Sequence, residues 1–232
     1  MVDQPSNQIP EVTLGRTFCA SLVVLATGLA LLWMATAGGQ SFTTETLRRQ
    51  QISAQPETID KFDVTTPSGE KTTLNALLAA GGKVWLVDFV YTRCQTVCSS
   101  LGTTYQQLQA HIEMRGLQNS VGLLSISFDP ANDDAAAVAA YAKRMRMNPA
   151  VWQIVTLSNW QDRRNLLDAF GIMVVPAPLG EFEHNAALHV VTSEAKLVRI
   201  MDYLEPKTAL DTAMAIAQSA TAGMQQNLRS PQ

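Results

Sequence analysis

Two cysteines, Cys94 and Cys98, are the residues of this chain whose type and spacing best suit chemistry. They follow Lys83–Tyr91, a valine- and aromatic-rich run typical of a strand buried on both faces, and the pattern from Val97 to Arg115 predicts a helix with one apolar face. The pair is therefore expected at the carboxyl end of a strand, where open α/β sheets gather ligands, and at a helix amino terminus, which favours thiolates. Thiolates one helical turn apart can hold a soft metal ion or close as a disulfide, and the spacing suits either outcome.

The three histidines decide whether the cysteine pair has an imidazole partner. His111 lies among polar residues of the predicted helix, and we interpret it as a surface residue. His184 precedes a predicted strand and His189 lies inside it, so in an extended chain the two rings would point to opposite faces. Joint ligation by both rings is not expected, which disfavours a zinc site of two cysteines and two histidines.

Strand-like and helix-like segments alternate through the rest of the chain. Besides Lys83–Tyr91, the expected strands are 61–64 and 71–74 as a hairpin, 121–128, 151–156, 186–192 and 196–201; the expected helices are 97–115, 133–147, 159–170 and one from about 205. Pro176 and Pro178 indicate a broken loop before His184. Alternation of this kind predicts an α/β domain of the thioredoxin-like fold, with a central mixed sheet flanked by helices.

An uncharged apolar run covers residues 18–37. At about 1.5 Å per residue, a helix of this length crosses the ~30 Å hydrocarbon core of a bilayer. A cleaved signal peptide is the alternative, and residues 35–37 resemble a cleavage site. The run exceeds the usual apolar region of a signal, however, and the preceding segment is not basic, since Asp3 and Glu11 stand against Arg16. We therefore expect one uncleaved N-terminal transmembrane helix.

Charged residues are few and balanced, with 17 basic and 20 acidic side chains and a net charge of -3. No Lys/Arg-rich stretch is interleaved with aromatic residues, so nucleic acid is not an expected partner.

Three cysteines are too few for a disulfide framework, and Cys19 is interpreted as a small apolar residue of the membrane helix. Arg48 and Arg49 follow the apolar run, so the positive-charge rule does not place the domain outside the cytosol. The cysteine pair does favour that side, because disulfides persist there.

Residues 38–56 are polar and lack a sustained apolar period, which predicts a tether. No internal repeat or low-complexity tract is present. We therefore divide the chain into an N-terminal tail (1–17), a transmembrane anchor (18–37), a linker (38–56), a thioredoxin-like domain (57–225) and a C-terminal tail (226–232).

Three stretches, VWLVDFVYTRCQTVC, SISFDP and EHNAALHVVTSEAKLV, resemble the Sco/SenC family of copper-binding, thioredoxin-like proteins that act in cytochrome oxidase assembly. The resemblance covers about residues 55–220. It implies a copper(I) site formed by Cys94, Cys98 and the distant His184. It also implies that Asp88 tunes this site; the alternative is a carboxylate satisfied at a strand end.

The chain departs from the family pattern at three places. Gln95 and Ser99 stand where the family commonly has proline after each cysteine, and Glu183 stands where it has aspartate before the histidine. Residues 192–195 replace a later turn motif. None of these changes removes an expected ligand, and they bear on metal affinity and the choice of partner.

The resemblance implies a copper(I) chaperone for a copper centre of respiratory cytochrome c oxidase. Its implied partners are an oxidase subunit carrying that centre, a copper donor and a thiol reductant, and its implied location is the bacterial inner membrane, single-pass, with the domain in the periplasm. Two other functions fit the same residues. One is a thiol–disulfide oxidoreductase that reduces the target through Cys94 and Cys98, and the other is a copper or redox sensor. A pair of inert buried cysteines is the structural alternative, and no motif supports a peroxidase.

Overall fold

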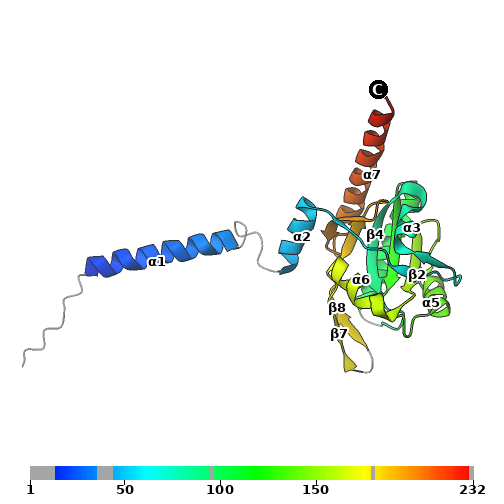
Figure 1. Cartoon of the computed structure of the whole chain (residues 1–232), viewed down its shortest axis with the longest axis horizontal. Helices are drawn as coiled ribbons and strands as arrows, with labels where there is room; N and C mark the ends of the chain where they lie inside the picture. The colour runs from blue at the N-terminus through cyan, green and yellow to red at the C-terminus, as the bar shows by residue number, and fades with distance from the viewer. Residues whose placement is uncertain (1–13, 36–43, 95–96, 179–180, 230–232) are drawn as a thin grey trace, which may run out of the picture. The chain divides into compact units, whose positions relative to one another are not determined.

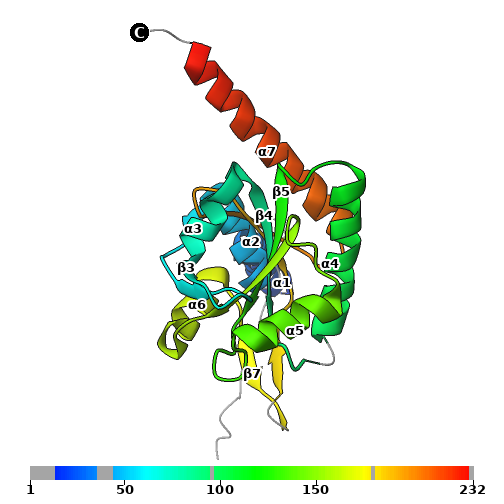
Figure 2. The ribbon, with the colours of Figure 1, turned by 90° about the vertical axis from the view of Figure 1, so that its right-hand side faces the viewer.

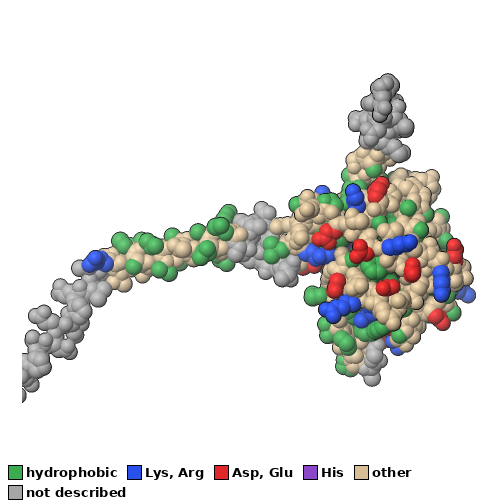
Figure 3. Space-filling view, viewed as in Figure 1, with side chains coloured by type: hydrophobic (Ala, Val, Ile, Leu, Met, Phe, Trp, Pro, Cys, Tyr) green, Lys and Arg blue, Asp and Glu red, His purple; other side chains and the backbone are tan. Residues whose placement is uncertain are grey.

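The computed structural model describes residues 14–35, 44–94, 97–178 and 181–229; the side chains of residues 97–100 are outside that description. The chain divides into two compact units, Met1–Arg48 and Arg49–Gln232. Helix α1 (Leu14–Ala35) belongs to the first unit (Figure 1). Its segment Gly15–Met34 is long and apolar enough to cross a membrane, and its side chains are exposed within the unit. Figure 3 shows hydrophobic side chains along this helix and mixed acidic and basic groups on the visible face of the domain.

Part of the predicted linker is helical. Helix α2 spans Thr44–Ala54, although its sequence is polar. Ile52 explains the difference, because this single apolar side chain is fully buried in the hydrophobic core of the second unit. One anchoring residue is too little to produce an apolar period in the sequence.

The second unit is built on an eight-stranded sheet in the order β1-β10-β9-β4-β5-β6-β2-β3. Its strands are β1 (Glu57–Thr58), β2 (Asp63–Thr65), β3 (Lys71–Thr73), β4 (Val84–Val90), β5 (Val121–Ser127), β6 (Trp152–Leu157), β9 (Leu188–Val191) and β10 (Lys196–Met201). Strands β4, β5 and β6 are parallel, whereas β9 runs antiparallel to β4 and β2 antiparallel to β6. The predicted mixed sheet is confirmed, including both hairpins.

Helices cover both faces of this sheet (Figure 2). They are α3 (Leu74–Ala79), α4 (Val97–Met114), α5 (Ala135–Met145), α6 (Arg163–Phe170) and α7 (Pro206–Arg229), with single 3-10 turns at Ala80–Gly82 and Trp160–Asp162. Apolar residues of α4 and α7 form one core against the sheet, and those of α2, α3, α5 and α6 form the other. Both cores exist because every residue of β4 and β5 is buried, as a strand covered on two faces requires.

The segment around Pro176 is a correction to the sequence analysis. In place of a broken loop, β7 (Val174–Pro176) pairs antiparallel with β8 (Phe182–His184) as a separate two-stranded sheet. Pro176 is tolerated because it ends its strand in a two-stranded ribbon, where few ladder hydrogen bonds are required of it. His184 is consequently the last residue of a strand rather than part of a loop.

Close packing between β4 and β5 requires a glycine at position 122. A Cβ atom placed on Gly122 would lie 2.6 Å from ring atoms of Trp85, which is almost fully buried and donates its Nε1–H to the Leu78 carbonyl. We expect Gly122→Ala to lower the free energy of unfolding by about 1–3 kcal/mol, because the rigid indole has no room to move. Urea denaturation of the detergent-solubilised chain measures this. Ser120→Ala, at an exposed position just before β5, is the control and should change it by less than about 0.5 kcal/mol.

Candidate functional site

The two cysteines lie where a buried strand gives way to a helix. Strand β4 ends at Val90, and the Cys94 amide donates to the Tyr91 carbonyl at 3.2 Å, which closes a turn after the strand. Cys98 is in the first turn of α4, and its side chain is outside the described part of the structure. The predicted strand-to-helix placement of the pair is confirmed for the backbone.

The antiparallel strand β9 brings the histidine to the same edge of the sheet. Because β9 pairs with β4 through Val87↔His189, the amino end of β9 lies beside the carboxyl end of β4. His184 ends β8, and three residues separate it from the first residue of β9. It is half-buried, and its ring packs near Phe128 and Tyr91, with centroid distances of 5.4 and 6.4 Å.

The surroundings of His184 favour the neutral imidazole. Burial lowers its pKa from the ordinary 6.5, while a hydrogen bond to the Asn185 carbonyl and the charge of Cys94 act in the opposite direction. Since a carbonyl oxygen only accepts, Nδ1 at 3.0 Å must carry the proton, and Nε2 then has the lone pair that a metal ion requires.

The other histidines are not part of this site. His189 is almost fully buried, and its Nδ1 and Nε2 lie 3.3 and 3.0 Å from the carbonyls of Val87 and Phe170. Its ring packs edge-on against Phe89. His111 is half-buried on α4 beside a shallow cavity with Lys207 and Leu210, among other residues. Both findings agree with the sequence analysis.

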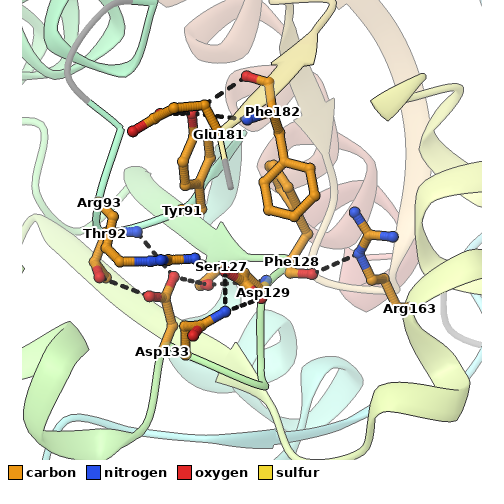
Figure 4. Close-up of polar contacts among 11 residues, drawn as sticks. Tyr91, Thr92, Arg93, Ser127, Phe128, Asp129, Asp133, Arg163, Glu181 and Phe182 are labelled. Carbon is orange, nitrogen blue, oxygen red and sulfur yellow. Dashed lines mark hydrogen bonds and ion pairs between the residues drawn. The ribbon is translucent and has the colours of Figure 1, made fainter. Parts of the chain in front are cut away.

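Tyr91 is a residue of the site that the sequence analysis missed. Its hydroxyl donates to Glu181 Oε2 at 2.5 Å, and the Phe182 amide donates to the same hydroxyl at 3.2 Å (Figure 4). Burial, then the Glu181 carboxylate, and to a smaller extent the Cys94 side chain raise the pKa of Tyr91. The tyrosine thus lies between the Cys94 loop and strand β8.

A buried carboxylate holds the loop that leads to Cys94 (Figure 4). Asp133 is fully buried and accepts hydrogen bonds from the Thr92 amide at 2.8 Å, the Thr92 hydroxyl at 2.6 Å and the Ser127 hydroxyl at 2.5 Å. The sequence analysis did not single out Asp133. The available signal was an acidic residue shortly after a buried parallel strand, at the sheet edge where sites form.

Arginine side chains border an open cavity beside Cys94. Arg93 forms an ion pair with the buried Asp129 at 3.1 Å, and Arg144 donates to the Thr92 carbonyl at 2.8 Å. Arg93, Arg144, Thr92 and Glu181 line a cavity of about 540 Å³ that Cys94 also lines. The cysteine is therefore accessible to a partner molecule from this side.

Removal of the Asp133 carboxylate tests how strongly it holds the loop. We expect Asp133→Ala to reduce the free energy of unfolding by about 2–3 kcal/mol, because buried donors on Thr92 and Ser127 lose their acceptor. Chemical denaturation followed by fluorescence measures the loss. Asp60→Ala, at an exposed position, should leave stability within about 0.5 kcal/mol of the unmodified chain, and equal effects of the two substitutions would contradict this role.

Asp88 lies in the interior rather than among the site residues. It is almost fully buried on the α4 face of β4, and neither oxygen makes a hydrogen bond of normal geometry, although Ser125 on β5 is near enough to lower its pKa slightly. Burial dominates and raises the pKa to about 7. The same carboxyl contributes to the raised pKa of Tyr105, after burial of that phenol. A role of Asp88 in tuning the site stays a prediction.

The raised pKa of Asp88 gives stability a definite dependence on pH. Between about pH 4 and pH 7 the unfolded carboxyl is ionised and the native one is not, so this group lowers the free energy of unfolding by about 1.4 kcal/mol per pH unit as pH rises. Asp88→Asn should remove that slope. Compared with the unmodified chain, the variant should therefore gain more stability at pH 8 than at pH 4. Urea titrations at both values measure it; an unchanged slope would contradict the assignment.

The described side chains bring a thiol and an imidazole together but do not by themselves complete a metal site. Across those residues, no group of three or more Cys, His, Asp or Glu side chains is placed to hold a metal ion. The side chain of Cys98, the third expected ligand, lies outside the described part of the structure. A mixed sheet flanked by helices, with a cysteine loop after its central strand, defines a thioredoxin-like protein.

Comparisons with known proteins give the family. The sequence model of the SCO1/SenC family matches residues 50–219, so the chain belongs to this family. A SCO1 protein homolog of Bacillus subtilis (strain 168) is 24% identical over 200 residues, covering 85% of this chain and 95% of that protein.

Solved structures show the same fold. BsSco, described as a member of the Sco family of cytochrome c oxidase assembly proteins and as having a disulfide switch, superposes with a TM-score of 0.60 at 20% identity, covering 71% of this chain and 95% of that chain. ScoI of Arabidopsis thaliana, solved with copper bound, has a TM-score of 0.57 at 16% identity, covering 70% of this chain and 98% of that chain. The predicted thioredoxin-like fold is confirmed.

Proposed function

We propose that this protein binds copper(I) through Cys94, Cys98 and His184 and delivers it to a copper centre of cytochrome c oxidase during assembly. Copper is then the cargo of the protein. Two thiolates and one imidazole suit soft copper(I) and leave the ion under-coordinated, so that it can pass to a partner.

The observation that carries this proposal is the meeting of Cys94 and His184 at one edge of the sheet. The two residues are far apart in sequence, yet both lie beside Tyr91, whose carbonyl accepts from the Cys94 amide and whose ring centroid is 6.4 Å from that of His184. Burial favours the neutral ring, and its Nδ1 bond to Asn185 directs the Nε2 lone pair to other partners. Copper in the related Arabidopsis ScoI supports the choice of metal.

The proposed partners follow from the location and chemistry of the site. We propose that α1 anchors the protein in the bacterial inner membrane with the domain in the periplasm, where an oxidase subunit with a copper centre is the acceptor. A copper donor loads the site, and a thiol reductant keeps Cys94 and Cys98 from closing as a disulfide. The open cavity at Cys94 is the side from which these partners would reach it.

Copper titration of the reduced, detergent-solubilised chain tests the proposal. We expect one equivalent of copper(I) per chain, and His184→Ala should lower the affinity by more than about 10-fold because it removes a ligand. Competition with a chromophoric copper(I) chelator measures the affinity.

His111→Ala is the matched control, since this histidine is half-buried on α4 and outside the site. It should change the affinity by less than about twofold. A fully reduced chain that takes up no copper(I), or one in which both substitutions have equal effects, would rule out the proposed function.

Thiol–disulfide exchange is a second candidate function, favoured by the location of the pair at a strand-to-helix junction and by the disulfide switch described for BsSco. A chain acting mainly in this way would reduce an oxidised copper-site peptide of the oxidase rapidly and would depend on Cys94 and Cys98 but not on His184. The His184→Ala variant in that assay separates the two candidates.

A further inference from the structure

The hairpin β7–β8 carries His184 but is not part of the main sheet. It is a two-stranded sheet of its own, and Figure 1 shows it extending from the domain below α6. At its base, Asn185 accepts from the Met173 amide at 2.7 Å and donates to the Gly171 carbonyl at 3.0 Å. These bonds join the two strands at their base, and additional contacts are needed to hold the hairpin against the Cys94 loop.

Tyr91 supplies contacts of that kind. Its hydroxyl donates to Glu181 Oε2 at 2.5 Å and accepts from the Phe182 amide at 3.2 Å. Its ring packs perpendicular to the Phe182 ring with a centroid distance of 5.3 Å. Glu181 directly precedes β8 and Phe182 is its first residue, so Tyr91 contacts the hairpin two residues before His184.

The same tyrosine is bonded to the cysteine loop through its backbone. The Tyr91 carbonyl accepts from the Cys94 amide, and the Tyr91 side chain is almost fully buried. The hydroxyl therefore has a fixed position relative to Cys94. A hydrogen bond to a carboxylate is shorter and stronger than one between neutral groups, and the Tyr91–Glu181 bond is of that type.

We propose that Tyr91 and Glu181 are positioning residues that hold strand β8, and with it His184, against the Cys94 loop. The inference rests on the proposed function, in which Cys94 and His184 bind copper(I) together. Neither Tyr91 nor Glu181 is itself a ligand in this proposal. Their bond sets how close imidazole and thiol are before the metal arrives, so that less ordering is required on binding.

Three substitutions test the bond while keeping the fold. Tyr91→Phe removes the hydroxyl and retains the packed ring, Glu181→Ala removes the acceptor at a half-buried position, and Glu181→Gln retains an oxygen acceptor. The matched controls are Tyr203→Phe, which removes a remote hydroxyl, and Glu70→Ala, which removes an exposed carboxylate outside the site.

The first measurement uses the metal-free chain in detergent. Amide hydrogen exchange of Phe182 should become about 10-fold faster in Tyr91→Phe, because the Phe182 amide loses the hydroxyl that accepts from it. The same acceleration is expected in Glu181→Ala, because the Tyr91 hydroxyl then loses the carboxylate that holds it in place. Glu181→Gln should stay within about threefold of the unmodified chain. Protection of β4 and β5 should be unchanged in all variants, which shows that the domain is folded.

The second measurement is copper(I) affinity. Tyr91→Phe and Glu181→Ala should each weaken binding by about 3- to 10-fold, and the double variant should be no weaker than Tyr91→Phe, since Glu181 acts through the Tyr91 hydroxyl. Neither control should change affinity by more than about twofold.

The outcomes separate this inference from the proposed function. Unchanged hairpin exchange and unchanged affinity in Tyr91→Phe and Glu181→Ala would overturn the inference while copper binding stands, and so would a Glu181→Gln variant as impaired as Glu181→Ala. If the unmodified chain binds no copper(I), the proposed function fails, and the exchange measurement alone then decides whether Tyr91 holds the hairpin.

Discussion

The antiparallel pairing of β9 with β4 is the constraint on which the site depends. In a wholly parallel sheet, the segment before a strand lies at the edge opposite the segment after its neighbour. Here the reversed direction of β9 places the residues before it, His184 among them, beside the loop that follows β4 and contains Cys94. The Val87↔His189 register fixes this arrangement, and burial of both strands on two faces makes a slip costly because it would exchange the side chains of the two cores. Cys94 and His184 lie at the same edge of the sheet because β9 runs antiparallel to β4.

Two buried polar connections then hold the loops at this edge. Asp133 holds Thr92, two residues before Cys94, and Tyr91 connects the same loop to strand β8. Arg163 adds a third element, since its guanidinium lies against the rings of Phe128 and Phe182 at 5.5 and 5.3 Å from their centroids. The Asp133 and Tyr91 connections pair polar groups that would otherwise be buried at a cost. The site is therefore supported by interactions with the interior of the domain and not only by its own loops.

Much of the fold was predictable because burial leaves a strong pattern in the sequence. The apolar run of β4 and the apolar face of α4 located Cys94 and Cys98 correctly along the backbone. The hairpin β7–β8 was missed because Pro176 and Pro178 usually interrupt strands, and α2 was missed because only Ile52 anchors it. Tyr91 and Asp133 escaped notice for a different reason. The pattern placed Tyr91 at the end of a buried strand and Asp133 at the start of a helix, where each has an ordinary structural role, and their bonds to Glu181 and Thr92 depend on tertiary contacts that no local pattern encodes. The choice of His184 came from family resemblance, and its position beside Cys94 required the strand register.

The wide separation in sequence between the two halves of the site has a consequence for how it forms. Tyr91 and Glu181 are 90 residues apart, so the cysteine loop is synthesised well before the hairpin that supplies the imidazole. A growing chain begins to fold from its amino-terminal end, and contacts of long range close late. During that interval an external oxidant can take two electrons and two protons from the thiols and close them as a disulfide, while the hairpin that carries the imidazole has not yet been made. Newly made chains thus pass through a stage with thiol reactivity alone, and the thiols and imidazole of the proposed copper site come together only when folding is finished.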